Sequence, residues 1–301
     1  MATTTAQVRD LLLPGLNAVF GDYEQLPTEW SDIFDKHTSK MSAERDVEMK
    51  MLGLAQLRTE GASAVYDDMG ERFTYSYVHV ETGLGFVITK IAIEDNLYKA
   101  QFSPGTRQLK NSLAQTKEVM GANVLNFAMD TSGQNNGGDG VPLLSTAHPL
   151  DLGLNANTFA IQSELNETSL QDAIVKIGRQ RDAAGLLVKI KPKKLIIAPE
   201  LQFVVDRLLG TSGRVGTSDN DTNAIVAKGL MAGGYSVNHF LTNTRSWYIK
   251  NDVTDGLKYF QRRALETDMY VDFDTDNLKT KATERFSFGW SNHRALFGCM
   301  P

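Results

Sequence analysis

The sequence contains one cysteine, Cys299, among 301 residues. A single thiol excludes an intrachain disulfide and any zinc site built from several cysteines. We interpret Cys299 as a small hydrophobic residue near the C-terminus rather than as a nucleophile. No apolar run approaches the ~18 residues that span a bilayer, and the first ten residues lack the pattern of a signal peptide. The sequence therefore predicts a soluble protein that does not associate with membranes.

An excess of positive charge is also missing. The chain has 31 Lys and Arg residues against 36 Asp and Glu, which gives a net charge of -5. Binding to nucleic acid through its phosphates requires several clustered cations. We therefore expect no specific or tight contact with DNA.

Catalytic and metal-binding motifs are absent too. The five histidines are scattered, and none lies four residues from another, as a metal site on a helix would require. Asp272, Asp274 and Asp276 resemble the start of a calcium loop, but no glycine follows and Thr283 occupies the twelfth position. No Gly-x-Ser-x-Gly sequence is present. These absences predict no catalytic residue, no metal ligand, no cofactor and no enzymatic activity.

The most informative segment is residues 127–150. A helical pattern ends near Asp130, and residues 133–140 that follow are all Gly, Asn or Asp except Gln134. Such residues tolerate positive φ and predict a sharply turned loop. The Lys-Ser/Thr of a nucleotide-binding loop does not follow. The loop leads to His148, which we interpret as a turn residue whose ring binds nearby backbone, rather than as a catalytic base.

Alternation of polar and apolar residues predicts strands over residues 72–80 and 84–93. The intervening Glu81-Thr82-Gly83 reads as a turn, so we expect the two strands to pair as a long hairpin. Phe73, Tyr75 and Tyr77 lie on one face of the first strand. A two-stranded hairpin is marginal alone in water, so we expect another subunit to cover this face.

Other segments complete an α+β pattern. An amphipathic helix is predicted over residues 5–20. Residues 21–61 suit an arm lying along other structure, such as another subunit, and carry scattered apolar residues: Trp30, Ile33, Phe34, Met49, Met51 and Leu52. A helix is predicted from Pro104 to Met129, about 40 Å long. A capping box at Thr168–Gln171 begins a second helix that Gly185 ends. Further elements are expected in order: a strand over 186–198, a helix from Pro199, a surface loop over 210–223, and strands over 237–241, 246–250, 256–260, 266–272 and 284–290.

This order of parts resembles the major capsid protein of tailed double-stranded DNA bacteriophages, most closely the Mu-type major head subunit. The residues that carry the resemblance are 83–98, 139–150, 193–200 and 246–249. The resemblance implies the tailed-phage major capsid fold. Its expected parts are an N-terminal arm (1–60), an extended hairpin loop (61–98), a peripheral domain built on the long helix (99–164 and 263–301) and an axial α/β domain (165–262).

The resemblance also implies a function in assembly. We expect hexamers and pentamers that form an icosahedral shell around the phage genome, assembled in the host bacterial cytoplasm and present in the virion. Expected partners are other copies of the chain, a separate scaffolding protein, a portal and a cement or decoration protein. The candidate contacts between subunits are aromatic and cationic residues: Trp30, Phe73, Tyr75, Tyr77, Phe86, Lys90, Arg262 and Arg263.

Two alternatives stay open at the level of sequence. Encapsulin nanocompartments share the fold that the resemblance implies, but they package enzymes. A nucleotide-binding α/β enzyme would have to use the loop over residues 133–140.

Overall fold

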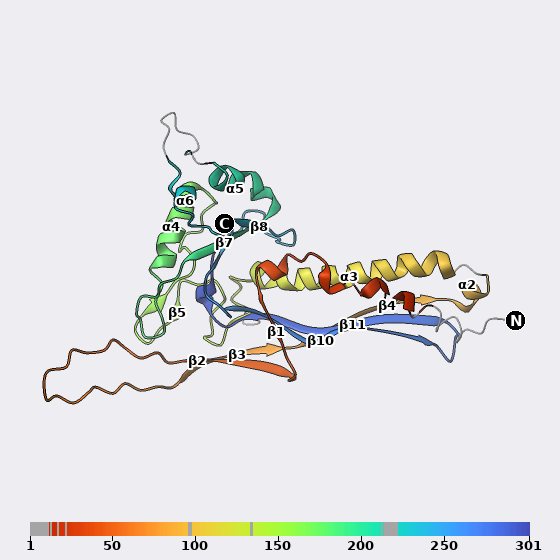
Figure 1. The fold of residues 1–301 in the computed structure, drawn as a ribbon, viewed down its shortest axis with the longest axis horizontal. Coiled ribbons are helices and arrows are strands. Elements are labelled where there is room, and N and C mark those ends of the chain that lie inside the picture. Colours follow the sequence, from red (N-terminus) through yellow and green to blue (C-terminus); the bar gives the residue numbers. More distant parts are fainter. Residues whose placement is uncertain are drawn as a thin grey trace.

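The computed structural model describes residues 12, 14–16, 18–21, 23–95, 98–132, 135–211, 213 and 222–301. The molecule is elongated: a long arm of sheet and helix extends to one side, a smaller α/β unit rises above it, and a hairpin projects to the other side (Figure 1). Within the arm, residues 14–16 and 18–20 are helical, and Val8 and Leu11 of the predicted N-terminal helix lie outside the described residues.

The arm is built on a four-stranded sheet of order β1-β10-β11-β4. β10 (Leu257–Val271) and β11 (Leu278–Trp290) are its two long antiparallel strands, while β1 (Asp35–Thr38) pairs parallel to β10 and β4 (Val80–Ile88) pairs antiparallel to β11. The sequence predicted β10 as two separate strands, over residues 256–260 and 266–272, and only the C-terminal half of β11, over residues 284–290. One face of the sheet is buried through Leu278, Ala282 and Phe286.

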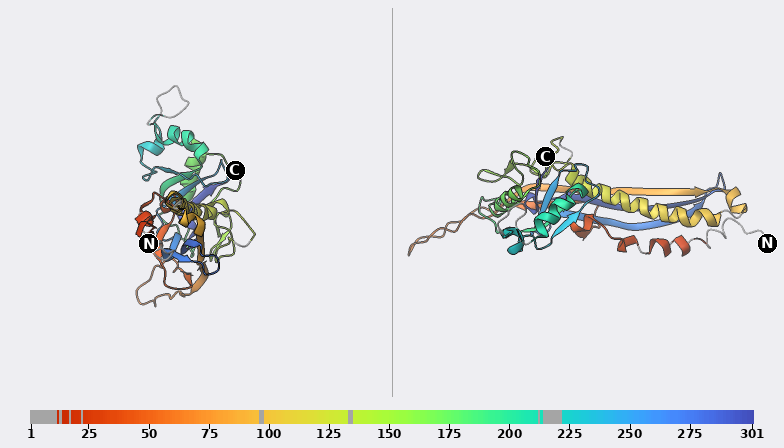
Figure 2. Two further views of the ribbon diagram at one scale, coloured as in Figure 1. Left: turned by 90° about the vertical axis from the view of Figure 1, so that its right-hand side faces the viewer. Right: turned by 90° about the horizontal axis from the view of Figure 1, so that it is seen from above.

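Helix α3 (Tyr98–Asn126) lies along this buried face, after the short helix α2 (Lys90–Glu94) (Figures 1 and 2). Leu109 and Leu113 are buried on its inner side, as the spacing predicted. Farther along, the predicted stripe is wrong in part: Thr116 and Phe127 are exposed, and Leu125 is buried instead. The helix begins six residues before Pro104, so the proline lies inside it rather than in the first turn. Gly121 has a packing reason: a Cβ there would lie 3.0 Å from Cβ of Trp30. Trp30 is in η2 (Trp30–Asp32), which follows η1 (Tyr23–Gln25).

The second unit contains a sheet of order β12-β9-β7-β8. Its strands are β7 (Pro192–Ile197), β8 (Tyr235–Val237), β9 (Trp247–Asn251) and β12 (Leu296–Cys299), the last preceded by η4 (His293–Ala295). The helical elements around it are α4 (Glu167–Gly178), η3 (Pro199–Leu201), α5 (Gln202–Leu209) and α6 (Ala224–Ala227). Cys299 is buried in this core, as the sequence predicted.

In this unit the structure corrects several of the helix and strand ends that the sequence predicted. Helix α4 is capped by Asn166 rather than Thr168: the Asn166 side chain accepts from the backbone N–H of Ser169, and the Ser169 hydroxyl accepts from the N–H of Asn166. The helix ends at Gly178, and Gly185, with φ +85°, occupies a later turn. The strand predicted over 186–198 begins only at Pro192. In the loop predicted over 210–223, residues 212 and 214–221 lie outside the described residues.

The predicted hairpin is wrong in its pairing. β3 (Glu71–Val78) pairs antiparallel with β2 (Ala43–Met49), whereas β4 joins β11 in the long sheet. Only His79 separates β3 from β4, so the chain passes from one sheet to the other there instead of turning back at Glu81-Thr82-Gly83. The alternation located both strands, although the second one ends at Ile88 and residues 90–93 of its predicted range belong to helix α2. Alternation carries no information about the partner of each strand. The extended hairpin of this molecule therefore comprises β2, β3 and the loop over residues 50–70.

A short two-stranded ribbon, β5 (His148–Pro149) with β6 (Leu154–Asn155), lies between the hairpin base and the second unit. In the segment that the sequence singled out, residues 127–150, the loop at Gly138 lies directly against β3 at Thr74. The α+β class is confirmed by these elements.

Candidate assembly surface

The loop over residues 50–70 projects away from the body of the molecule (Figures 1 and 2). It contains no helix or strand, and all its residues are described. Its base is closed by a backbone hydrogen bond from Lys50 N–H to the Gly70 carbonyl, 2.7 Å long. Farther out, the Asp67 carboxylate accepts from the backbone N–H of Gly53 at 2.8 Å. Hydrogen bonds from Gly53 and Asp68 lower the pKa of Asp67 and keep the carboxylate charged.

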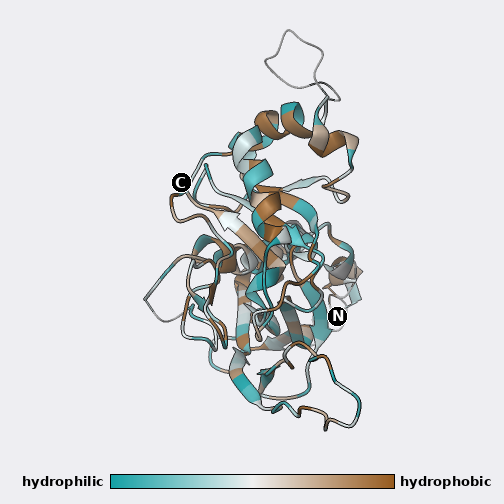
Figure 3. Cartoon of the chain, turned by 90° about the vertical axis from the view of Figure 1, so that its left-hand side faces the viewer, coloured by the Kyte–Doolittle hydropathy of each residue, from teal (hydrophilic) through white to brown (hydrophobic). Residues whose placement is uncertain are grey.

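The side chains of this loop are unusually apolar for an exposed segment. Leu57 is completely exposed, and Tyr66 is 91% exposed. Seven large apolar residues within 50–70 are exposed: Met51, Leu52, Leu54, Leu57, Val65, Tyr66 and Met69. Figure 3, which looks toward the tip of the loop, shows hydrophobic positions interspersed with hydrophilic ones along its course. Several of them line an open space of about 700 Å³ between the two legs. Exposed apolar segments of this kind are typical of surfaces that bind a partner.

Three of the aromatic residues predicted to contact other subunits are instead buried within their own chain. Trp30, Tyr75 and Tyr77 are 6%, 4% and 3% exposed. Tyr75 packs against Trp290 and Tyr77 against Phe260, with ring centroids 5.4 and 4.9 Å apart. The prediction for these three is corrected, because β3 crosses over the ends of β10 and β11 and its inward face is covered there. They have almost no surface left for a neighbour.

The remaining candidates keep some exposed surface, and their role between subunits stays a prediction. Phe73 and Phe86 are half-buried against the core. The Lys90 ammonium group is exposed and lies 2.8 Å from the Asp276 carboxylate. Arg263 pairs with Glu81 at 2.8 Å, and Arg262 lies next to it at an irregularity in β10.

The apolar residues of the predicted N-terminal arm also fall into a buried group and an exposed group. Trp30, Ile33 and Phe34, expected to lie on another subunit, are buried in the core of their own chain. The Glu118 carboxylate of α3 accepts from the backbone N–H groups of Glu29 and Trp30 at 2.9 and 3.0 Å and holds this segment in place. Met51 and Leu52, from the same predicted arm, are exposed. The sequence predicted the apolar character of the arm correctly but could not separate these two groups.

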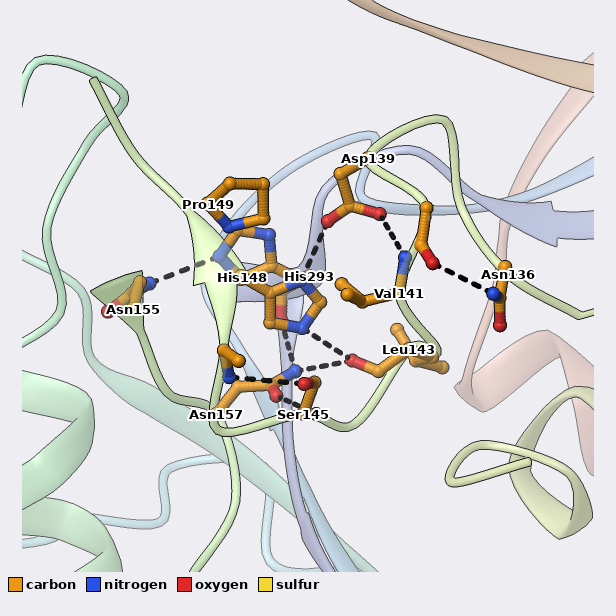
Figure 4. A network of polar contacts seen from close by, with 12 residues as sticks. Asn136, Asp139, Val141, Leu143, Ser145, His148, Pro149, Asn155, Asn157 and His293 are labelled. Carbon is orange, nitrogen blue, oxygen red and sulfur yellow. Dashed lines mark hydrogen bonds and ion pairs between the residues drawn. The ribbon is translucent and has the colours of Figure 1, made fainter. Parts of the chain in front are cut away.

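A buried polar cluster connects the Gly/Asn loop to the C-terminal segment (Figure 4). The Nδ1 of His148 lies 2.7 Å from the Asp139 carboxylate, and its Nε2 lies 3.2 Å from the Leu143 carbonyl oxygen. The bond to Leu143 confirms the interpretation of His148 as a residue that binds nearby backbone. The ring also stacks on His293, with centroids 3.8 Å apart and planes 4° from parallel. The sequence gave no signal for this contact, because His148 and His293 are far apart along the chain.

The two rings have different polar partners. The two nitrogens of His148 face oxygen atoms of the Asp139 carboxylate and of the Leu143 carbonyl. The Nε2 of His293 accepts a hydrogen bond from the Asn155 amide at 3.1 Å. Burial, followed by repulsion from His148, holds the pKa of His293 well below its usual 6.5. The cluster is thus closed to solvent, and its His293 ring is neutral near pH 7.

Asp139, His148 and His293 are also the group of described residues whose side chains come close enough to suggest a metal site. Their arrangement does not fit one. A metal ion binds an imidazole nitrogen in the plane of the ring at about 2.0–2.1 Å. Two parallel rings cannot both direct a nitrogen lone pair to the same ion. The cluster therefore ties segments of the fold together and is not a metal centre.

The Gly/Asn loop is also unsuited to binding phosphate. Gly133 and Gln134 lie outside the described residues, but the backbone N–H groups of Gly137, Gly140 and Val141 all bind acceptors inside the loop. A phosphate-binding loop instead leaves such groups free to point at the ligand. The observed loop packs against the protein, which argues against the nucleotide-binding alternative.

Among the described residues, no helix is both long and apolar enough to cross a membrane. None of the curated proteins matches the chain in sequence. Solved structures with the same fold include a virus-like particle from Pyrococcus furiosus, with a TM-score of 0.57 at 11% identity over 94% of this chain and 97% of that one. The structure titled Microbacterium phage Oxtober96 matches with a TM-score of 0.54 at 10% identity over 91% of both chains. The capsid of a native GTA particle matches with a TM-score of 0.56 at 10% identity, over 89% of this chain and 88% of that one.

These similarities show the α+β fold of tailed-phage major capsid proteins. The family model for phage capsid proteins matches residues 74–298, which is well over half of the chain. The match runs from β3 through the long helix and both sheets to β12. The chain therefore belongs to the phage capsid protein family.

Proposed function

We propose that the chain is the major subunit of an icosahedral phage head, and that it assembles through the loop over residues 50–70, which covers a neighbouring copy. The observation that carries this proposal is the set of seven exposed apolar side chains on a segment that its own chain leaves uncovered. Burying apolar surface contributes roughly 25 cal/mol per Å². A loop of this composition is therefore more stable against a partner than in water.

The proposed assembly consists of hexamers and pentamers in one closed lattice. A standard protein interface buries about 1,600 Å², and one projecting loop per subunit supplies a contact that recurs at every copy. Modest contacts repeated in this way give a stable shell, because each subunit is held by several neighbours at once. The role is structural, without catalysis.

The finer assignments follow from the resemblance and from the family. Within the family, we infer a Mu-type head subunit from the order of segments along the chain. We also propose a separate scaffolding protein, a portal and a cement or decoration protein as partners, with assembly in the host cytoplasm. The shell would enclose duplex DNA without specific contacts, in keeping with the net charge of -5. The family match does not favour the encapsulin alternative.

The test replaces the apolar side chains of the loop while the core stays intact. Leu54→Ser, Leu57→Ser and Tyr66→Ser are combined in one variant, and the matched control combines Leu54→Met, Leu57→Met and Tyr66→Phe. The experiment uses conditions in which the unaltered chain forms particles, followed by sedimentation and negative-stain electron microscopy. We expect particles from the control and free subunits or small oligomers from the serine variant. Normal particles from the serine variant would refute the proposed role of the loop.

A further inference from the structure

The pairing of β2 with β3 is irregular where the extended hairpin leaves the body. In the β2–β3 pairing, Val47 lies opposite Thr74 and Met49 opposite Glu71, so the single residue Glu48 faces two residues of β3. This is a β-bulge, a feature that bends a strand and redirects its course. The two residues of the bulge are Arg72 and Phe73. The chain beyond them, including the loop over residues 50–70 (the assembly loop), leaves the body through this bulge.

A cluster of charged side chains holds it. The Glu48 carboxylate lies between two guanidinium groups, 3.3 Å from Nη1 of Arg72 and 3.5 Å from Nη1 of Arg294. The Arg72 Nε also lies 3.0 Å from the Asp151 carboxylate. The side chains of Arg72 and Arg294 are only 10% and 8% exposed, so they need the carboxylates to compensate their charge.

The cluster joins the hairpin to fixed parts of the molecule. Arg294 belongs to η4 and donates from Nε to the Arg181 carbonyl oxygen at 2.6 Å. Arg72 donates to the carbonyl oxygen of Pro149 in β5 at 3.2 Å, and its guanidinium lies over the ring of Phe73 at 4.7 Å. Both residues of the bulge are thus attached to the body, Arg72 through charge and Phe73 through its contact with the core.

The Gly/Asn loop supplies the second support. A Cβ at Gly138 would lie 2.3 Å from the Thr74 carbonyl oxygen, so the backbone of the loop lies directly against the backbone of β3. Only glycine permits this approach. The cluster of Asp139, His148 and His293 fixes the loop from behind.

We propose that Glu48, Arg72, Arg294 and Gly138 are positioning residues that set the angle at which the assembly loop leaves the subunit. This inference rests on the proposed function of the loop. Each leg of about ten residues reaches roughly 30 Å when extended. A rotation of about 10° at the bulge therefore moves the tip by about 5 Å, enough to change which part of a neighbour the loop meets.

The test measures the direction of the hairpin in the purified full-length subunit. Spin labels are placed at Met51→Cys, just beyond the bulge, and at Gln115→Cys on the exposed side of α3, while the native Cys299 is buried. Glu48→Gln removes the shared carboxylate charge with little change in shape. We expect a broader distance distribution for Glu48→Gln than for the unaltered chain. The matched control, Lys281→Gln, neutralises an exposed ion pair with Asp268 in the long sheet and should leave the distribution unchanged.

Gly138→Ala provides a second, independent variant. Its methyl group must push β3 away, so we expect a shifted mean distance rather than a broader distribution. Both variants should also give malformed or fewer particles, whereas Lys281→Gln should give normal ones. If both variants keep the distance distribution of the unaltered chain, the inference is wrong, even where the serine variant of the loop still abolishes particles. Altered distances with particles of normal size and yield would overturn it as well.

Discussion

The base and the loop of the extended hairpin both carry large apolar side chains, but these side chains lie in opposite environments. At the base, Tyr75 and Tyr77 lie in the core, only 4% and 3% exposed. In the loop, Tyr66 and Leu57 are almost wholly exposed. The base crosses the ends of β10 and β11 and is covered by them, whereas the loop extends past the last element that could cover it. Apolar composition shows that a segment will be buried, but not whether its own chain or a neighbour buries it.

The largest effect expected from this comparison is at the base. Tyr75→Ala should lower the free energy of unfolding by about 3–5 kcal/mol, the usual cost of truncating a buried aromatic side chain. Urea denaturation of the isolated subunit measures it. The matched control is Tyr270→Ala on β10, where the side chain is 42% exposed and the loss should be below about 1 kcal/mol. Equal losses at the two positions would show that the base is not part of the core.

The histidine cluster beneath the base predicts a pH dependence that the loop lacks, since residues 50–70 contain no histidine. Unfolded His293 takes up a proton as the pH falls below about 6.5, whereas burial keeps the folded residue neutral to a lower pH. Unfolding therefore takes up a proton in that range, and the free energy of unfolding falls as the pH decreases below about 6.5.

The measurement is a series of urea denaturation curves between pH 7.5 and 5, a range of about one unit above and below the ordinary pKa of histidine. His293→Gln should be less stable at neutral pH but should lose part of the slope with pH. If the variant and the unaltered chain have the same slope, His293 does not remain neutral in the folded state.

The smallest effect on stability is expected in the loop. Leu57→Ser should change the free energy of unfolding by less than about 0.5 kcal/mol, because the side chain has no packing to lose. Thermal and urea denaturation of the subunit measure it, with Leu57→Met as the matched control. A loss of several kcal/mol would show that the loop, like the base, packs on its own chain.

Much of the local structure could be predicted from sequence. The spacing of Leu109 and Leu113 predicted the long helix, and alternation located β3 and the second half of β4. Turn residues predicted the sharp loop before His148. The class and the order of parts followed from these signals, and with them the resemblance to tailed-phage capsid proteins. Of the assembly surface, the sequence indicated an apolar arm that reaches another subunit, with Met51 and Leu52 within it.

Only the tertiary structure decided which strands pair and whether an apolar face is covered by its own chain. Alternation shows which side chains share a face of a strand, but the partner strand comes from hydrogen bonds between segments far apart in sequence. β3 therefore pairs with β2 across 21 residues, and β4 with β11 across almost 190. The stacking of His148 on His293 and the sharing of Glu48 by two arginines are nonlocal for the same reason. The sequence by itself determined the elements and their apolar faces; the folded arrangement decided which faces the chain covers itself and which it leaves for a neighbour, because coverage depends on what lies opposite in space.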